Sequence, residues 1–428
     1  MKLLFALCCA CPWLMAQDAA SWQIHAQATT VTQQHGTFTS PYADANSLQD
    51  VHQRESTLTT TLMTGVRPWR GGEFYLDGEG AAGEGCSGAL GLAGSPNGEA
   101  YRVGNPAFHA AIVRLLLKQT WDLGGQPQKV EDDAHQLAGS TPSRRVVVEA
   151  GKFSVMDFFD NNAYSHDPRS QFLNWVLMGH GAWDYPADTR GYTEGFAAEF
   201  YWDAWAARFG RFAEPVVANM MQMDHAFGRA HGDALELEHD HSLGDLPGVV
   251  RVLFYRNTAR MGDYREALAE SPVNPDVTLT RAYGRVKRGY GVNLEQALSA
   301  DLGAFARWSW DDGRTESWAF TEVDRSLTGG VALKGSAWHR PQDHFGLALI
   351  QNGLSPDHIA YLSAGGLGFL IGDGRLNYQP ERIYETYYAA AMGHYFTATL
   401  DLQRCWNPAY NADRGPVSLV ALRCHVQF

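Results

Sequence analysis

The chain has 428 residues and a formal net charge of −13 at pH 7, which argues against a general affinity for nucleic acid or acidic lipid. Glycine is abundant, with 44 residues, and aromatic residues make up 12%. A chain of this length can bury a large core or close into one large barrel.

The N-terminus resembles a secretory signal. Lys2 precedes an apolar run from Leu3 to Leu14, and cleavage is expected near Ala16. A signal peptide over residues 1–16 leaves one domain over residues 17–428. The alternative is a lipoprotein signal that uses a leader cysteine, although the residues before each of these fit that signal poorly. The leader cysteines are Cys8, Cys9 and Cys11.

Three cysteines remain after the leader, and an odd number argues against a disulfide framework. They are Cys86, Cys405 and Cys424. Strand alternation places Cys405 and Cys424 on opposite faces, which argues against a bridge between them. Beyond the leader no window holds about 18 consecutive apolar residues, so no transmembrane helix is expected. An exported chain of this kind can still enter a membrane as a closed barrel, which pairs every backbone group between strands.

The first clear elements form a hairpin. Residues 57–66 alternate threonine or methionine with leucine, threonine or valine, and a period of two predicts a strand. Gly71-Gly72 follows as a turn. Residues 73–80 then alternate, with an acidic or tyrosine side chain at every odd position. The pattern predicts a hairpin with an acidic inner face, made by Glu73, Tyr75, Asp77 and Glu79.

The next segments are less decisive. The stretch Gly78–Gly94 contains G-x-G-x-x-G, but no parallel βαβ unit surrounds it, so a flexible loop is expected. Pro106–Leu123 is equally compatible with a helix and with a strand carrying Arg114 and Lys118. Gly124–Ser143 is polar and predicts a loop.

The rest of the chain alternates repeatedly. Val146 opens a strand that ends in Gly151-Lys152-Phe153, and from Val249 onward short alternating segments are separated by turns. Such regular spacing predicts a barrel or a sandwich. Examples are Leu302–Trp310, Trp318–Val323, Gly330–Trp338 and Phe345–Gln351, with short turns at Asp311-Asp312-Gly313 and His339-Arg340-Pro341.

The last stretch, Val417–Phe428, is the most regular. Val420, Leu422, Cys424, Val426 and Phe428 share one face, and mostly polar residues share the other. A strand with lipid outside and water inside has this pattern. A soluble β-protein alternates in the same way, so this strand alone does not decide between them.

A long distinctive block begins at Gly151. It reads Gly151-Lys152-Phe153-Ser154-Val155-Met156-Asp157-Phe158-Phe159-Asp160-Asn161-Asn162, then Tyr164-Ser165-His166-Asp167-Pro168-Arg169, Phe172, Asn174-Trp175 and Gly181-Ala182-Trp183-Asp184-Tyr185-Pro186-Ala187-Asp188-Thr189-Arg190-Gly191. This block resembles the carbohydrate-selective porin (OprB) family. Further matches are Ser40-Pro41-Tyr42, Pro96-Asn97-Gly98-Glu99-Ala100, Asn293-Leu294-Glu295-Gln296, Ile371-Gly372-Asp373-Gly374-Arg375-Leu376 and Asn407-Pro408-Ala409-Tyr410-Asn411-Ala412-Asp413-Arg414-Gly415-Pro416. Together they run from about Gln27 to Phe428.

The resemblance implies an all-β transmembrane barrel of 16 antiparallel strands in a bacterial outer membrane. Its loops would be long outside the cell and its turns short in the periplasm. It would pass small neutral sugars by diffusion, without catalysis and without a cofactor or metal. Its other partners would be outer-membrane lipids and the barrel-assembly machinery, which would engage the C-terminal strand ending in Phe428. Which sugar it prefers and its oligomeric state stay open.

The central block supplies the chemistry that a sugar channel needs. Carboxylates accept from sugar hydroxyls, arginine donates through a rigid fork, and aromatic rings stack on C–H faces. A charged and aromatic constriction is therefore predicted. The alternative for each single residue is a turn or a membrane-interface aromatic. The candidate residues are Lys152, Asp157, Asp160, Arg169, Trp183, Asp184 and Arg190.

Other functions have weaker support. His225, His231, His239 and His241 match no zinc spacing, and a solvated loop is expected there. The paired carboxylates Asp157 and Asp160 are compatible with a glycosidase. However, no H-E-x-x-H or G-x-S-x-G motif is present. A secreted carbohydrate-active enzyme and a secreted sugar-binding β-protein remain the alternatives to a sugar porin.

Overall fold

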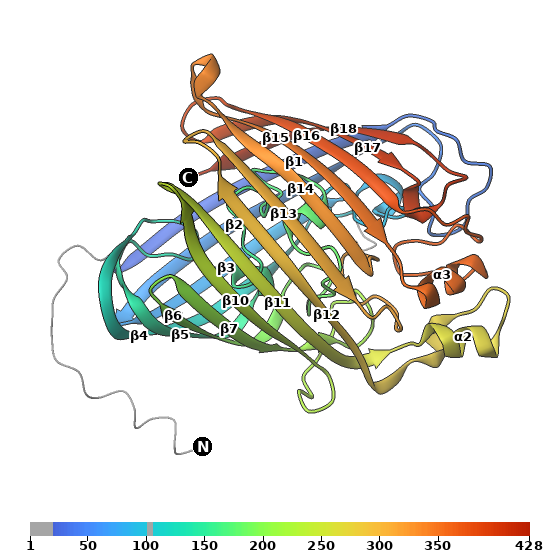
Figure 1. The fold of residues 1–428 in the computed structure, drawn as a ribbon, viewed down its shortest axis with the longest axis horizontal. Coiled ribbons are helices and arrows are strands. Elements are labelled where there is room, and N and C mark those ends of the chain that lie inside the picture. The colour runs from blue at the N-terminus through green and yellow to red at the C-terminus, as the bar shows by residue number, and fades with distance from the viewer. Residues whose placement is uncertain (1–19, 101–105) are drawn as a thin grey trace.

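The protein is described by a computed structural model over residues 20–100 and 106–428. Within these residues sixteen antiparallel strands close into one barrel (Figure 1). β1 (Trp22–His35) pairs with β18 (Val417–Gln427), for example through Ala28 and Val426, and this pairing closes the wall. The predicted all-β barrel of 16 strands is confirmed. The expected leader, residues 1–16, lies outside the described residues.

The remaining elements follow one another around the wall. The other barrel strands are β2 (Gln53–Trp69), β3 (Gly72–Gly83), β4 (His109–Val130), β5 (Gly139–Phe153), β6 (Thr193–Trp202), β7 (Trp205–Phe212), β10 (His231–Leu243), β11 (Leu246–Met261), β12 (Ala282–Ala297), β13 (Leu302–Asp311), β14 (Arg325–Gly335), β15 (Arg340–Gly353), β16 (Glu381–Ala391) and β17 (Phe396–Trp406). Two short strands, β8 (Glu214–Pro215) and β9 (Met223–Asp224), pair separately. The α-helices are α1 (Trp175–Met178), α2 (Tyr264–Glu270) and α3 (Pro356–Ser363). No helix of the described residues is both long and apolar enough to cross a membrane.

The two ends of the barrel differ in their connections. Turns such as 203–204 and 244–245 are short, and the C-terminus lies at that end (Figure 1). The opposite end carries long connections such as 154–192, 262–281 and 354–380, and α2 and α3 lie there. Outer-membrane barrels have short periplasmic turns and long extracellular loops. The loop end is therefore the extracellular end.

Side chains alternate across the wall as the sequence predicts. In β18 Leu422 is 52% exposed on the outer face, whereas Arg423 is fully buried inside. In β3 Phe74 and Leu76 face outward, and Asp77 lies inside and is buried. The acidic inner face of the first hairpin is confirmed. Likewise Cys405 is buried inside the barrel while Cys424, next to Leu422 in the alternation, lies on the outer face.

Three local predictions need correction. Most of Pro106–Leu123, which was compatible with a helix or a strand, lies in strand β4. β4 and β5 also extend through much of Gly124–Ser143, which was expected to be a loop. Its β4 part, residues 124–129, is polar and exposed, so it has no apolar face to mark it as a strand. Residues 312–324 form one connection, so Asp311-Asp312-Gly313 is not a short turn and Trp318–Val323 is not a strand. Trp318 is fully buried, because this connection packs on both sides inside the barrel.

The histidine stretch is also not a solvated loop. His231, His239 and His241 belong to strand β10, while His225 lies in the preceding connection. The ring of His239 stacks on Trp205 of β7 with centroids 4.1 Å apart. Among the acidic residues that suggested a loop, Glu236 and Glu238 occupy inward positions of this barrel strand, whereas Asp233 faces outward.

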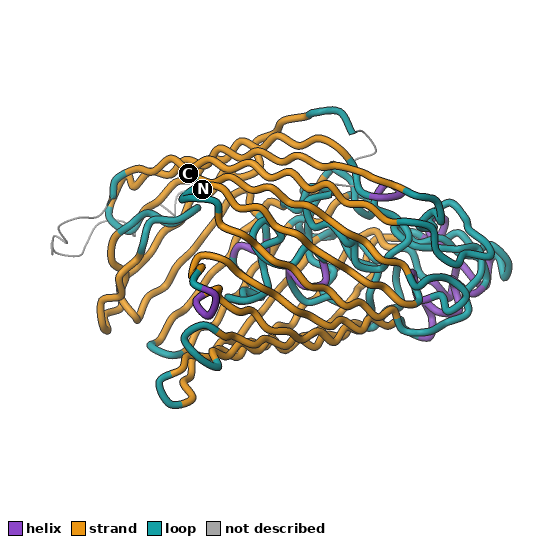
Figure 2. Tube along the Cα trace, turned by 90° about the horizontal axis from the view of Figure 1, so that it is seen from above, coloured by secondary structure: helices purple, strands orange, loops and turns teal. Residues whose placement is uncertain are grey.

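Loops occupy part of the barrel interior (Figure 2). The connections 84–100, 154–192 and 312–324 turn inward and contact one another. Trp175 donates its backbone N–H to the carbonyl of Ser95 at 3.0 Å, and its ring stacks on Phe320 at 4.6 Å. The backbone N–H of Glu322 donates to the carbonyl of Ala93 at 2.9 Å. The three connections therefore form one packed body inside the wall.

Candidate functional site

Residues 154–192 leave β5 and cross the lumen before β6 begins. The crossing starts with a capping box between Ser154 and Asp157 around one 3-10 turn. Further on, the side chain of Asn174 accepts from the backbone N–H of Val176 at 3.0 Å and starts α1. The backbone N–H of Leu173 reaches Glu385 on β16, which lies across the barrel from β5. The loop thus spans the barrel from wall to wall.

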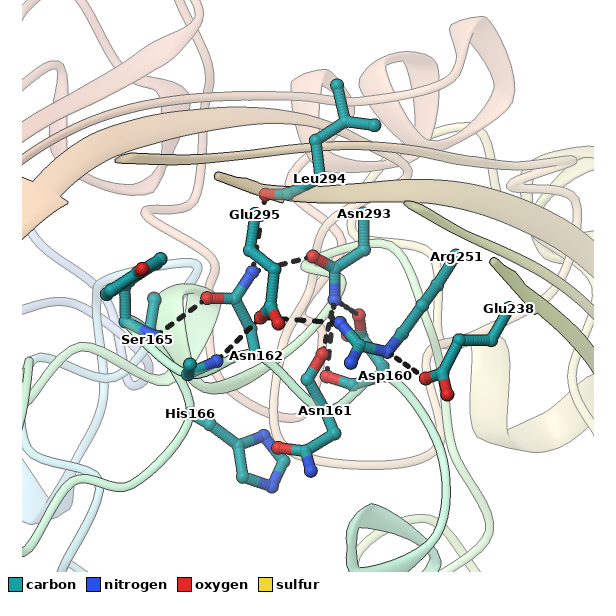
Figure 3. A network of polar contacts seen from close by, with 12 residues as sticks. Asp160, Asn161, Asn162, Ser165, His166, Glu238, Arg251, Asn293, Leu294 and Glu295 are labelled. Atoms are coloured by element: carbon teal, nitrogen blue, oxygen red, sulfur yellow. Dashed lines mark hydrogen bonds and ion pairs between the residues drawn. The ribbon is translucent and has the colours of Figure 1, made fainter. Parts of the chain in front are cut away.

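Asp160 fixes this crossing to the far wall (Figure 3). Its carboxylate accepts from Arg307 Nε at 3.1 Å and Asn293 Nδ2 at 2.5 Å, and its backbone N–H donates to Glu236 at 2.7 Å. Burial alone raises the pKa of Asp160, but the Arg307 guanidinium and the donated hydrogen bonds hold that pKa below its usual value. The side chain is fully buried and therefore works as an anchor.

The same wall holds the next residues of the loop. Asn162 donates to Asn293 Oδ1 at 2.7 Å, and the backbone N–H of Ala163 donates to Glu295 at 2.7 Å. Glu295 in turn lies 3.4 Å from Arg251, which also pairs with Glu238 (Figure 3). Charged wall residues of β10, β11 and β12 thus form a network that continues into the loop.

Trp183 and Asp184 form a second buried anchor. The ring of Trp183 is 2% exposed and packs edge-on against Phe159 at 6.2 Å. The carboxylate of Asp184 accepts from Lys287 Nζ on β12 at 2.9 Å and from the backbone N–H of Trp318 at 2.8 Å. These contacts join the loop to the wall and to the connection 312–324.

Asp157 and Arg169 lie on the opposite side of the loop, toward β2, β3 and β4. Their side chains remain 23% and 15% exposed. Arg114 of β4 donates to both carboxylate oxygens of Asp157, at 2.8 and 2.6 Å. Arg169 donates through Nε to Glu99 at 2.9 Å and through Nη2 to Glu79 of β3 at 3.1 Å.

Tyr192 connects these two ion pairs. Its hydroxyl donates to Glu79 at 3.2 Å, and the guanidinium of Arg114 lies 5.3 Å from the centre of its ring. These contacts join two guanidinium groups, three carboxylates and one phenol into a continuous group, which we call the arginine cluster. Its members are Glu79, Glu99, Arg114, Asp157, Arg169 and Tyr192.

Lys152 and Arg190 lie elsewhere. Lys152 lies at the end of β5, opposite Leu115 and Glu194 on the neighbouring strands. A hollow of about 310 Å³ beside it is lined also by Asp188, Tyr192 and His225. Arg190 lies in the turn before β6, and its Nε has no hydrogen-bond partner among the described residues.

Two of the seven residues predicted from the sequence, Asp157 and Arg169, belong to the arginine cluster. Its other members were not predicted as site residues. The signal for Glu79 and Arg114 was present, because both fall on charged inner positions of expected strands. Nothing in the sequence indicated that Glu99 would turn inward from another connection. In the described part of the chain, no group of three or more His, Cys, Asp or Glu side chains is arranged to hold a metal.

A closed antiparallel barrel with an inward loop across its lumen defines a membrane channel. The family model for the carbohydrate-selective porin, OprB family matches residues 45–428. Among solved structures, that of Pseudomonas putida OprB superposes with a TM-score of 0.72 at 16% identity, covering 95% of this chain and 94% of that one. The outer membrane channel DcaP of Acinetobacter baumannii gives a TM-score of 0.52 at 8% identity, over 95% and 97% of the two chains. No curated protein matches the chain.

The chain belongs to the carbohydrate-selective porin, OprB family. It is an outer-membrane porin through which carbohydrate diffuses passively, and the predicted family resemblance is confirmed. The family and the fold are those of a channel rather than of an enzyme.

Proposed function

We propose that small neutral sugars cross this porin between the loop 154–192 and the wall β2–β4, in contact with the arginine cluster. The observation that supports this path is the partial exposure of Asp157 and Arg169 inside the barrel. Arg114 and Arg169 offer fork donors, and Asp157 offers an acceptor, so a sugar finds both partners for its hydroxyls. Two guanidinium groups are shared among four carboxylates, including that of Asp77, so the cluster favours neutral solutes over anions.

The other predicted site residues take different roles in this proposal. Asp160, Trp183 and Asp184 position the loop, since their side chains are buried in contacts with the wall and with other loops. Arg190 contacts the sugar at the mouth of the channel. Its buried Nε has no partner among the described residues and gains a hydrogen bond when a sugar hydroxyl arrives. Lys152 stays near the extracellular rim.

The export route belongs to the same proposal. A leader over residues 1–16 directs the chain across the inner membrane and is removed. The assembly machinery of the outer membrane then engages the closing strand β18, and lipids surround the apolar outer wall.

Liposome swelling tests the proposed substrate class. Vesicles containing the protein are placed in a neutral hexose or in a uronic acid of similar size, and the initial swelling rates are compared. We expect the neutral sugar to enter faster. Arg114→Gln should increase this preference, because it removes a positive charge that attracts the anionic uronate. Equal rates for both solutes in the parent protein contradict the proposed selectivity.

A further inference from the structure

The outer wall carries two arginines that face each other and form no ion pair. Asp233 of β10 lies opposite Arg256 on its other side, but both oxygens of its carboxylate accept from Arg211 instead. Arg256 of β11 and Arg288 of β12 are direct cross-strand neighbours, and both are exposed on the outer face. Their side chains form no ion pair or hydrogen bond with any other described residue. Like charges directly opposite each other on a sheet are destabilising, so this arrangement lacks a partner for its charge.

Aromatic rings lie next to this arginine pair on the membrane side. Phe254 and Tyr290, also cross-strand neighbours, follow Arg256 and Arg288 two positions along each strand toward the periplasm. Their ring centroids lie 6.4 Å apart, and Tyr290 also contacts Trp308 at 5.4 Å and Trp310 at 5.3 Å. Such rings mark the level where a membrane's polar headgroups meet its hydrocarbon. The two guanidinium groups therefore lie at the headgroup level of the extracellular leaflet.

Three other arginines on the outer face of the same end have partners. Arg211 donates to both oxygens of Asp233, at 2.7 and 2.9 Å. Arg382 donates to Gln351 at 3.2 Å, and Arg404 donates to Ser418 at 2.6 Å. Arg256 and Arg288 differ from these three arginines because they lie directly opposite each other and their side chains have no partner among the described residues.

We propose that Arg256 and Arg288 form a docking site for the phosphate of a lipid in the extracellular leaflet. Guanidinium forks bind phosphate through paired, charge-assisted hydrogen bonds. The ring surface of Phe254, Tyr290, Trp308 and Trp310 then contacts the apolar part of the same lipid. A phosphate held between the two arginines also cancels their repulsion.

Native mass spectrometry of the full chain in detergent tests the site, with lipid A carrying two phosphates as the probe. We expect Arg256→Gln/Arg288→Gln to weaken lipid A binding by about tenfold, the effect of losing charge-assisted hydrogen bonds. The matched control, Arg382→Gln/Arg404→Gln, removes the same charge from the same end and should bind like the parent. Both variants are first checked for folded mobility on unheated gels, and Arg288→Gln alone replaces the double variant if the double variant does not assemble.

Three results overturn the proposal. Equal losses in the test and control variants show that only net charge matters. Equal binding of lipid A from which the phosphates have been removed shows that the arginines do not select phosphate. Complete displacement of the lipid by excess inorganic phosphate assigns the site to the free anion instead of a lipid.

Discussion

The loop 154–192 carries two arginine–aspartate pairs whose aspartates are three residues apart, and the pairs have opposite surroundings. Asp160 and Arg307 are 0% and 1% exposed. Asp157 and Arg114 are 23% and 13% exposed and lie on the side of the loop facing β2–β4. The same residue types therefore serve two purposes, one holding the loop in place and the other left open to solute.

The difference follows from burial. A buried charge whose partner is removed stays uncompensated in a medium of low dielectric, whereas a partly exposed charge regains water. Mutations in the buried pair should therefore change the structure of the channel, and mutations in the open pair should change what it binds.

The largest effect is expected for Arg307→Ala. This variant leaves Asp160 buried without its charged partner, at a cost of about 3–5 kcal/mol. We expect less folded protein on unheated gels and, in the channels that do form, higher conductance because the loop is no longer held. Asp157→Asn is the control, since it breaks the open pair and leaves Arg114 paired with Asp77. Equal folded yields for the two variants would remove the distinction between the pairs.

Trp183→Ala tests the second buried anchor, and we expect a loss of stability of similar size. Removing a buried tryptophan costs about 3–5 kcal/mol through the cavity that it leaves. We expect a lower thermal transition and little change in the sugar concentration that half-blocks the ion current. The sequence alone predicts the reverse, namely a normal barrel with weaker sugar block, because it treats Trp183 as a stacking platform. Planar-bilayer recordings together with thermal melts distinguish the two outcomes.

The wall of the barrel could be predicted because its signal is local. Alternation in residues 57–80 and 417–428 depends only on the two-residue period of a strand. In both stretches the more apolar face of the strand lies outward and the more polar face inward, as predicted. Secondary structure was predicted wrongly in two segments where buried and exposed residues do not alternate. Residues 124–129 are polar and exposed, so neither face is marked by apolar side chains. Trp318–Val323 is buried on both sides because it lies inside the barrel.

The roles of the site residues could not be predicted in the same way. Arg307 is 147 positions from Asp160 in sequence, and the two meet only because the loop crosses the lumen. Composition indicated that charged and aromatic residues concentrate in this block. Which of them are buried and which stay open depends on the path of the loop, and that path is set by wall residues such as Glu236, Asn293 and Glu385.

A smaller effect, on binding alone, is expected for Arg169→Gln. Losing a charged hydrogen bond costs about 1.5–3 kcal/mol, so the sugar concentration for half-block should rise by about tenfold or more. Folding should be preserved, because Tyr192 and Thr61 still donate to Glu79. Burial raises the pKa of Glu99 and allows that carboxyl to take up a proton when Arg169 is gone. Arg382→Gln on the outer wall is the matched control. Parent-like block by Arg169→Gln would place the sugar path elsewhere in the lumen.

The smallest effect is a pH-dependent gain in stability from Glu214→Gln. Glu214 is fully buried in β8, and neither carboxylate oxygen has a hydrogen-bond partner among the described residues. Burial, reinforced by the carboxylate of Asp184, raises the pKa of Glu214 well above its usual value.

Because the pKa of Glu214 is higher in the folded than in the unfolded state, its ionisation destabilises the fold progressively as pH rises above about 4.3, the value for a free glutamate. Glutamine has the same shape and no such penalty, so the variant should melt higher than the parent at pH 7. The difference should disappear below pH ~4, where glutamate is protonated in both states. Thermal melts at the two pH values measure it, and a gain of equal size at both would show that charge is not the cause.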